Sequence, residues 1–106
     1  MRLYRAVSQA ERDDIAASGV FRQHADSFAF GKWFALNQQN AASWGRWFAD
    51  RDGLRYYVVE TEAVDAEARQ LAIIENLDNI GAAVFLMESR LSTLPILFIS
   101  PALSND

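Results

Sequence analysis

Strand-like apolar runs follow one another closely along this sequence. Ala82–Met87 and Pro95–Ser100 are two such runs, and the short polar stretch Ser89–Thr93 is expected to connect them. A parallel connection needs a crossover of about a dozen residues or more, usually a helix, so strands at this spacing pair antiparallel. The sequence therefore predicts an α+β fold in which a mixed or mainly antiparallel sheet has two or three helices packed on it.

The N-terminal segment predicts a strand that leads directly into a helix. Leu3–Val7 has the alternation of a strand. Ser8 and Glu11 then have the spacing of a capping box, in which both side chains satisfy backbone donors at a helix start. We expect this helix to cover Gln9–Ser18 and to end at Gly19, because glycine accepts the left-handed cap conformation.

A second strand and a second helix are expected next. Lys32–Leu36 reads as a strand, and Asn37 is a typical helix N-cap. The helix is expected over Gln38–Ala49. Its apolar residues recur at helical spacing, which predicts a buried stripe made of Ala41, Trp44 and Phe48, with Trp47 beside it.

The middle of the chain predicts a third strand and a short helix. Asp50–Gly53 is a strong turn signal. Leu54–Glu62 is rich in tyrosine and valine, as strands are. Asp65 has the position of an N-cap for a helix from Ala66 to about Ile74, and Asn76–Gly81 is expected to break that helix.

Length and composition predict one domain. With 106 residues there is room for one core, so we expect a single globular domain over residues 1–106, with residues 101–106 as a flexible tail. The first residues show no apolar stretch of a signal peptide, and no apolar run is long enough to span a bilayer. The expected location is the cytoplasm of a bacterium-like cell.

Composition disfavours several classes of site. The chain has no cysteine and a single histidine, His24, so disulfides, thiolate ligands and His-rich metal clusters are excluded and no metal is expected. The net charge is −4, and the basic residues are scattered along the chain. Duplex binding normally requires a basic face, so nucleic acid is not the expected partner.

Two segments are candidates for binding an anionic ligand. Arg5 stands between apolar neighbours in the first strand, where a charge needs a partner or a ligand anion. The alternative is an arginine at the surface beside an acidic residue. In Gly31–Phe34, Lys32 could hold a phosphate while Trp33 stacks on a planar base. The alternative is that these aromatic rings belong to the core.

Three glutamates are candidates for acid–base chemistry. Glu60 and Glu62 are two apart on one strand and point to the same side, where paired carboxylates can share such work. Glu88 follows the buried-strand pattern of Ala82–Met87, as a catalytic acid or a cation stabiliser would. All three are also what solvated strand ends look like.

Several of these segments together resemble one family. Leu3–Ser8 is similar to the first-strand arginine motif of the ADP-ribosyltransferase-like fold, which includes small bacterial toxin-like domains. Gly31–Ala35 followed by Ala41–Gly45 looks like the second strand and following helix of such domains. Asn76–Gly81, leading to Glu88, resembles the approach to their late glutamate. The resemblance spans residues 3 to about 90.

The resemblance implies that NAD is the substrate, and it implies a role for each candidate. Arg5 would engage the NAD phosphates, with Lys32 as a further cofactor-binding residue. Trp33 would belong to the aromatic cradle of the nicotinamide. Glu88 would be the catalytic residue that stabilises the ribose cation. No metal is implied.

Two positions depart from the family pattern. Lys32–Ala35 stands where the family usually carries a Ser-Thr-Ser type sequence, and Leu86 stands two residues before Glu88, where Glu or Gln is frequent. Binding of NAD or a related nucleotide without catalysis is therefore left open, since a fold does not fix a function.

The C-terminal run supports an alternative of another class, a non-catalytic homodimeric protein-interaction module. Leu94–Ile99 is apolar on both alternating faces, and its proline suits an edge strand. An uncovered strand edge tends to find a partner. We expect a homodimer in which this segment, alone or with Phe85 and Met87, is buried by a second copy; another protein is the alternative partner.

Overall fold

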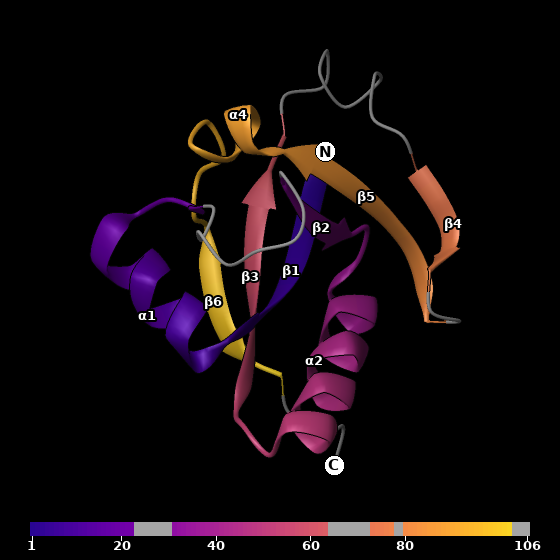
Figure 1. Cartoon of the computed structure of the whole chain (residues 1–106). Helices are drawn as coiled ribbons and strands as arrows, with labels where there is room; N and C mark the ends of the chain where they lie inside the picture. Colours follow the sequence, from indigo (N-terminus) through magenta and orange to yellow (C-terminus); the bar gives the residue numbers. More distant parts are fainter. Residues whose placement is uncertain (23–30, 64–72, 78–79, 103–106) are drawn as a thin grey trace.

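The computed structural model of the chain describes residues 1–22, 31–63, 73–77 and 80–102 (Figure 1). In chain order its elements are β1 (Arg2–Ser8), α1 (Gln9–Ser18), β2 (Gly31–Ala35), α2 (Gln38–Asp52), β3 (Tyr56–Glu62), β4 (Ile73–Leu77), β5 (Gly81–Met87), α4 (Glu88–Leu91) and β6 (Phe98–Pro101).

Within the described residues, the strands form one six-stranded sheet in the order β4-β5-β2-β1-β3-β6. Every neighbouring pair of strands is antiparallel. β1 lies inside the sheet between β2 and β3, and β4 and β6 are its edges. The predicted α+β class, with a mainly antiparallel sheet and helices packed on it, is confirmed.

Each face of the sheet has its own apolar core. The core on the α1 face consists of Leu3, Val7, Ile15, Phe21, Phe34, Val59, Ala63, Val84, Leu86, Leu91 and Leu94. The core on the α2 face consists of Ala35, Ala41, Trp44, Val58 and Ala83. Because successive strand residues point to opposite faces, Val58 and Val59 contribute to different cores.

Local caps explain where the two longer helices begin and end. The backbone N–H of Glu11 donates to the Ser8 side chain at 3.2 Å, and Gly19 ends α1 at a φ of +76°. The Asn37 side chain caps α2 in the same way, and Gly53 ends it at a φ of +69°. These caps confirm the predicted starts of both helices, although α2 continues beyond the expected end at Ala49.

The prediction of a helix from Ala66 to about Ile74 is wrong at its C-terminal end. Residues Ile73–Leu77 form strand β4, where we expected the end of a helix and then a break. The backbone of β4 pairs with β5, for example Ile74 opposite Ala83. Two consecutive β-branched residues favour a strand once a partner is available. Asp65 and residues 66–72, the remainder of that predicted helix, lie outside the described residues, as does His24.

Two boundaries near the C-terminus also differ from expectation. The stretch expected as a connection, Ser89–Thr93, includes all of the short helix α4 except its first residue. This helix places Leu91 in the core, where its exposure is 1%. Strand β6 begins at Phe98 rather than Pro95. Pro95 is instead held by its carbonyl, which accepts a hydrogen bond from the buried Thr61 hydroxyl at 2.6 Å.

The last described residues belong to the sheet. Pro101 ends β6, and the Ala102 N–H donates to the Tyr56 carbonyl at 3.0 Å. Gly45 permits Ala102 to pack closely against α2, since a Cβ at position 45 would lie 2.6 Å from the Ala102 Cβ. The expected tail therefore does not begin at residue 101. No helix in the described part of the chain combines the length and apolar character needed to cross a membrane.

Candidate functional site

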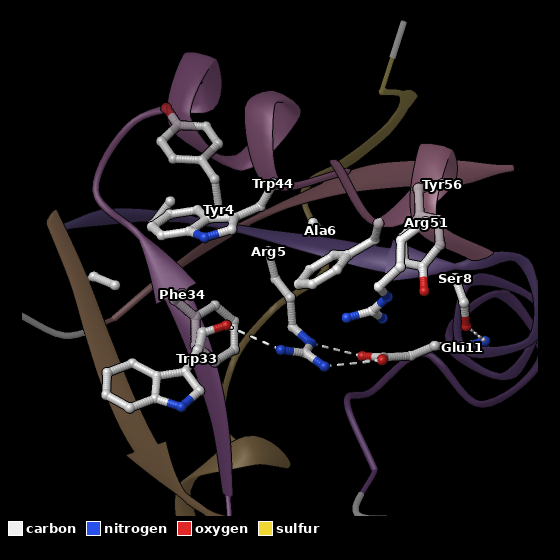
Figure 2. A pocket seen from close by; sticks show the side chains of 13 residues that line it. Tyr4, Arg5, Ala6, Ser8, Glu11, Trp33, Phe34, Trp44, Arg51 and Tyr56 are labelled. Carbon is white, nitrogen blue, oxygen red and sulfur yellow. Dashed lines mark hydrogen bonds and ion pairs between the residues drawn. The ribbon is translucent and has the colours of Figure 1, made fainter. Parts of the chain in front are cut away.

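The sheet opens between β1 and β2. β1 pairs with β3 along its whole length, but with β2 only at Tyr4 opposite Ala35. A cavity of about 460 Å³ lies at this opening (Figure 2), within the size range of small-molecule sites. We call it the β1–β2 cleft. Its aromatic lining residues are Tyr4, Trp33, Phe34, Trp44, Phe48 and Tyr56, and its charged ones are Arg5, Glu11 and Arg51.

Arg5 lies at the opening and connects both of its sides. Its Nε and Nη2 donate to the two carboxylate oxygens of Glu11 at 2.8 and 3.0 Å, and its Nη1 donates to the Trp33 carbonyl of β2 at 3.0 Å. The Arg5 side chain thus satisfies the Trp33 carbonyl, which backbone pairing between β1 and β2 would otherwise satisfy. These bonds use three of the five guanidinium donors. They hold the group in a fixed orientation beside the cavity (Figure 2).

Lys32 lies on the α1 face of β2 and meets the same carboxylate. Its Nζ is 3.4 Å from Oε2 of Glu11, and its side chain is only 4% exposed. Burial lowers the pKa of Lys32, and the Arg5 charge lowers it further, while Glu11 and Asp14 oppose the change only in part. Burial raises the pKa of Glu11, but the nearby Arg5 and Lys32 outweigh burial, so the net pKa is lowered. Glu11 is therefore ionised at neutral pH.

With Arg5 and Lys32 protonated and Glu11 ionised, this cluster formally carries one more positive than negative charge. The neighbouring pair formed by Arg22 and Asp14 adds one charge of each sign and leaves this excess unchanged. A desolvated cation is costly unless an anion compensates it. The arrangement is therefore suited to an anionic group entering the cleft.

Aromatic rings line the cleft on both sides of its opening. Trp33 is 38% exposed on β2, and Phe85 supports it in an edge-to-face contact at 5.2 Å between ring centroids. On the other side Phe48 of α2 contacts Tyr56 of β3 at 5.5 Å. Exposed, supported rings can stack on a planar ligand group.

Arg51 reaches the cleft from the last turn of α2. Its guanidinium lies over the Phe48 ring at 4.9 Å and the Trp47 ring at 5.3 Å. Nε and Nη2 donate to the Asp52 carboxylate at 2.7 and 3.1 Å, and the Tyr56 hydroxyl donates to the same carboxylate at 2.9 Å. The hydrogen bond from Arg51 lowers the pKa of Asp52, and that from Tyr56 adds to the effect.

The structure brings together three of the four residues that the resemblance selected. Arg5 and Trp33 line the cleft, and Lys32 lies behind it on the α1 face. Glu88 is not among the lining residues. It is the exposed first residue of α4, and it follows β5 at the end where β2 begins.

The paired carboxylates of β3 lie outside the cleft lining. Arg2 forms an ion pair with Glu60 and lies 3.5 Å from Glu62. The Glu62 side chain is 49% exposed. Glu62 therefore matches the interpretation of a solvated strand end, whereas the Glu60 side chain is only 23% exposed.

Sequence reasoning missed two charged residues of the site. Glu11 was interpreted only as a capping residue, although an acidic side chain in the turn after the Arg5 strand is near enough to reach back to it. Arg51 was interpreted only as part of a turn. The one available signal was its spacing three and four residues after Phe48 and Trp47, which places it on the same side of a helix.

Comparison with protein-family models, with curated proteins and with solved structures finds no match to this chain. In the described part of the chain, no group of three or more His, Cys, Asp or Glu residues is placed to hold a metal ion.

Proposed function

We propose that this protein is a nucleotide-binding domain of ADP-ribosyltransferase-like character, and that its β1–β2 cleft binds NAD or a related nucleotide. One observation carries the proposal. The cluster of Arg5, Lys32 and Glu11 holds an excess positive charge directly beside an aromatic-lined cavity.

The charge favours a phosphate as the anionic part of the ligand. Arg5 is held by Glu11 and by the Trp33 carbonyl, and two of its donors remain for a ligand. A guanidinium that is already oriented loses less entropy on binding an oxyanion. Lys32 adds long-range attraction for a phosphate, because a buried charge is screened less than a charge in water.

The rings favour a planar group attached to that phosphate. Trp33 and Tyr56 both line the cavity, and Figure 2 shows them on opposite sides of Arg5. A ligand whose phosphate contacts Arg5 would thus have an aromatic surface within the same cavity. An adenine or nicotinamide nucleotide has both features.

The catalytic role of Glu88 stays a prediction from the resemblance. Because Glu88 lies outside the cleft lining, the proposal concerns binding, and turnover is a separate question. If the protein hydrolyses NAD or transfers ADP-ribose, Glu88→Gln is expected to abolish turnover and leave affinity largely intact, since the carboxylate would act on the cationic transition state.

Titration with NAD tests the proposal. Trp33 and Trp44 line the cleft, so NAD is expected to quench tryptophan emission with a saturable curve. Lys32→Met removes the excess charge and leaves the Arg5–Glu11 pair in place, so its affinity is expected to fall about three- to tenfold. Arg2→Gln removes an exposed charge outside the cleft lining and is the matched control, with unchanged affinity. Absence of binding at about 1 mM NAD would reject the proposal.

A second candidate function rests on the free edge of β6. We propose that this edge forms a homodimer contact. β6 pairs only with β3 in the described sheet. Leu97, the residue before β6, and Phe98, its first residue, are 42% and 62% exposed. Phe85 and Met87 lie on β5, which β2, β1 and β3 separate from β6, so they do not share this edge.

A further inference from the structure

The cleft has a second guanidinium, and it enters from another element. Arg5 comes from β1, and Arg51 comes from the last turn of α2. Both side chains line the same cavity, and both point into it in Figure 2. The resemblance assigns no role to Arg51.

The contacts of Arg51 orient its guanidinium without using all of its donors. Asp52 binds the edge formed by Nε and Nη2, and the guanidinium lies over the rings of Phe48 and Trp47. The two N–H groups of Nη1 have no partner among the described residues. The Tyr56 hydroxyl holds Asp52 in turn. The side chain is 54% exposed, so a ligand can reach it.

We propose that Arg51 binds a second phosphate, so that the β1–β2 cleft selects nucleoside diphosphates, such as the ADP part of NAD or ADP-ribose, over nucleoside monophosphates. This inference rests on the proposed function. The first phosphate contacts Arg5, beside the excess charge that Lys32 supplies. The second contacts the free Nη1 edge of Arg51.

The two arginines differ in what holds them, and this difference supports separate roles. Arg5 is 19% exposed and shares its counter-ion with a buried lysine, so a net charge remains. Arg51 has a carboxylate of its own in Asp52, so the pair is formally neutral. A monophosphate compensates the excess charge at Arg5, and it gains little binding free energy from Arg51. A diphosphate has an additional anionic group for the donors of Arg51.

Calorimetric titration of three proteins with two ligands tests the inference. The ligands are ADP-ribose and AMP, and the proteins are the unmodified chain, Arg51→Gln and the control Arg55→Gln. Arg55 is exposed, lies four residues further along and is not among the lining residues. Arg51→Gln is expected to weaken ADP-ribose binding about tenfold, the effect of one charge-assisted contact. AMP binding to this variant should stay within about twofold of the unmodified protein, and Arg55→Gln should change neither affinity.

The outcomes separate this inference from the proposed function. If Arg51→Gln weakens the binding of ADP-ribose and AMP equally, Arg51 contacts the adenosine monophosphate part that both ligands share. This result would overturn the inference. Unchanged ADP-ribose affinity would also overturn it. In both cases the unmodified protein still binds, and the proposed function stands. Failure of the unmodified protein to bind either ligand would reject both. Circular dichroism of the variants checks that each is folded.

Discussion

Glu11 holds both cations of the cluster and also caps a helix. Its carboxylate binds Arg5 through two oxygens and lies 3.4 Å from Lys32. Its backbone N–H also donates to the Ser8 side chain, which caps the start of α1. The start of α1 therefore fixes where the carboxylate lies, and the carboxylate fixes where Arg5 lies beside the cleft.

Removal of this carboxylate is expected to destabilise the fold. Glu11→Gln leaves two partly or fully buried cations without their counter-ion. Breaking a buried pair costs about 3–5 kcal/mol, and we expect about 2–4 kcal/mol here because Arg5 keeps some contact with water. Urea denaturation at pH 7 measures the loss. A loss below about 0.5 kcal/mol, typical of a surface position, would contradict the described cluster.

The same loss should depend on pH with a definite sign. The pKa of Glu11 is lower in the folded protein than its ordinary value of 4.5. Its carboxylate therefore stabilises the fold above pH 4.5, and this contribution disappears as the pH falls through the lowered pKa. The difference in unfolding free energy between the unmodified protein and Glu11→Gln is expected to shrink below pH 4.5. Glu62→Gln, at an exposed carboxylate, is the control.

Helix α2 forms one side of the cleft and is anchored by one ring. Trp44 is 7% exposed and belongs to the core of the α2 face, while Trp47 on the same helix is 50% exposed. Trp44 also lines the cavity. The position of α2 therefore determines both the fold and the shape of the site.

Truncation of these two tryptophans should give very different results. Trp44→Ala is expected to lower the free energy of unfolding by about 3–5 kcal/mol, as for other large core aromatics. Trp47→Ala removes an exposed ring together with its contacts to Arg51 and Phe48 at the surface, so about 1 kcal/mol or less is expected. Thermal or urea denaturation of both variants checks the pair, and equal losses would contradict the packing of α2.

Elements with local signals were predictable, and those that depend on distant partners were not. The caps at Ser8 and Asn37 lie next to the helices they start, so α1 and α2 could be located from the sequence. β4 becomes a strand through its pairing with β5. α4 is selected by the burial of Leu91. Neither the pairing of β4 with β5 nor the burial of Leu91 leaves a recognisable pattern in the sequence of β4 or α4.

The site depends on the arrangement of the whole sheet, because it forms where β1 and β2 separate. Arg5 was predictable, because a charge in an apolar strand requires a partner. Its placement beside Trp33 depends on β1 lying next to β2, and the contribution of Arg51 depends on α2 covering the same opening. Such contacts between distant segments carry no periodic signal, which is why the contributions of Glu11 and Arg51 to the site were not predicted.

The free edge of β6 leads to a prediction about assembly. In a two-fold dimer the same edge from each copy would pair and bury Leu97 and Phe98. Sedimentation at micromolar concentration is expected to give twice the chain mass of 11.9 kDa. Leu97→Asp should yield a folded monomer, because this side chain is already exposed within one copy. Leu54→Asp, at another exposed leucine, should remain dimeric. A monomer for the unmodified chain would exclude the dimer.

The most direct test of the central claim is an amide chemical-shift map of the protein during titration with NAD. If the β1–β2 cleft binds the nucleotide, the amides of Tyr4–Ala6 and Gly31–Trp33 should shift together and saturate at one affinity. The amides of Phe98–Ser100, on the far edge strand, should stay in place. Shifts confined to β6, or no shifts at millimolar NAD, would contradict the claim.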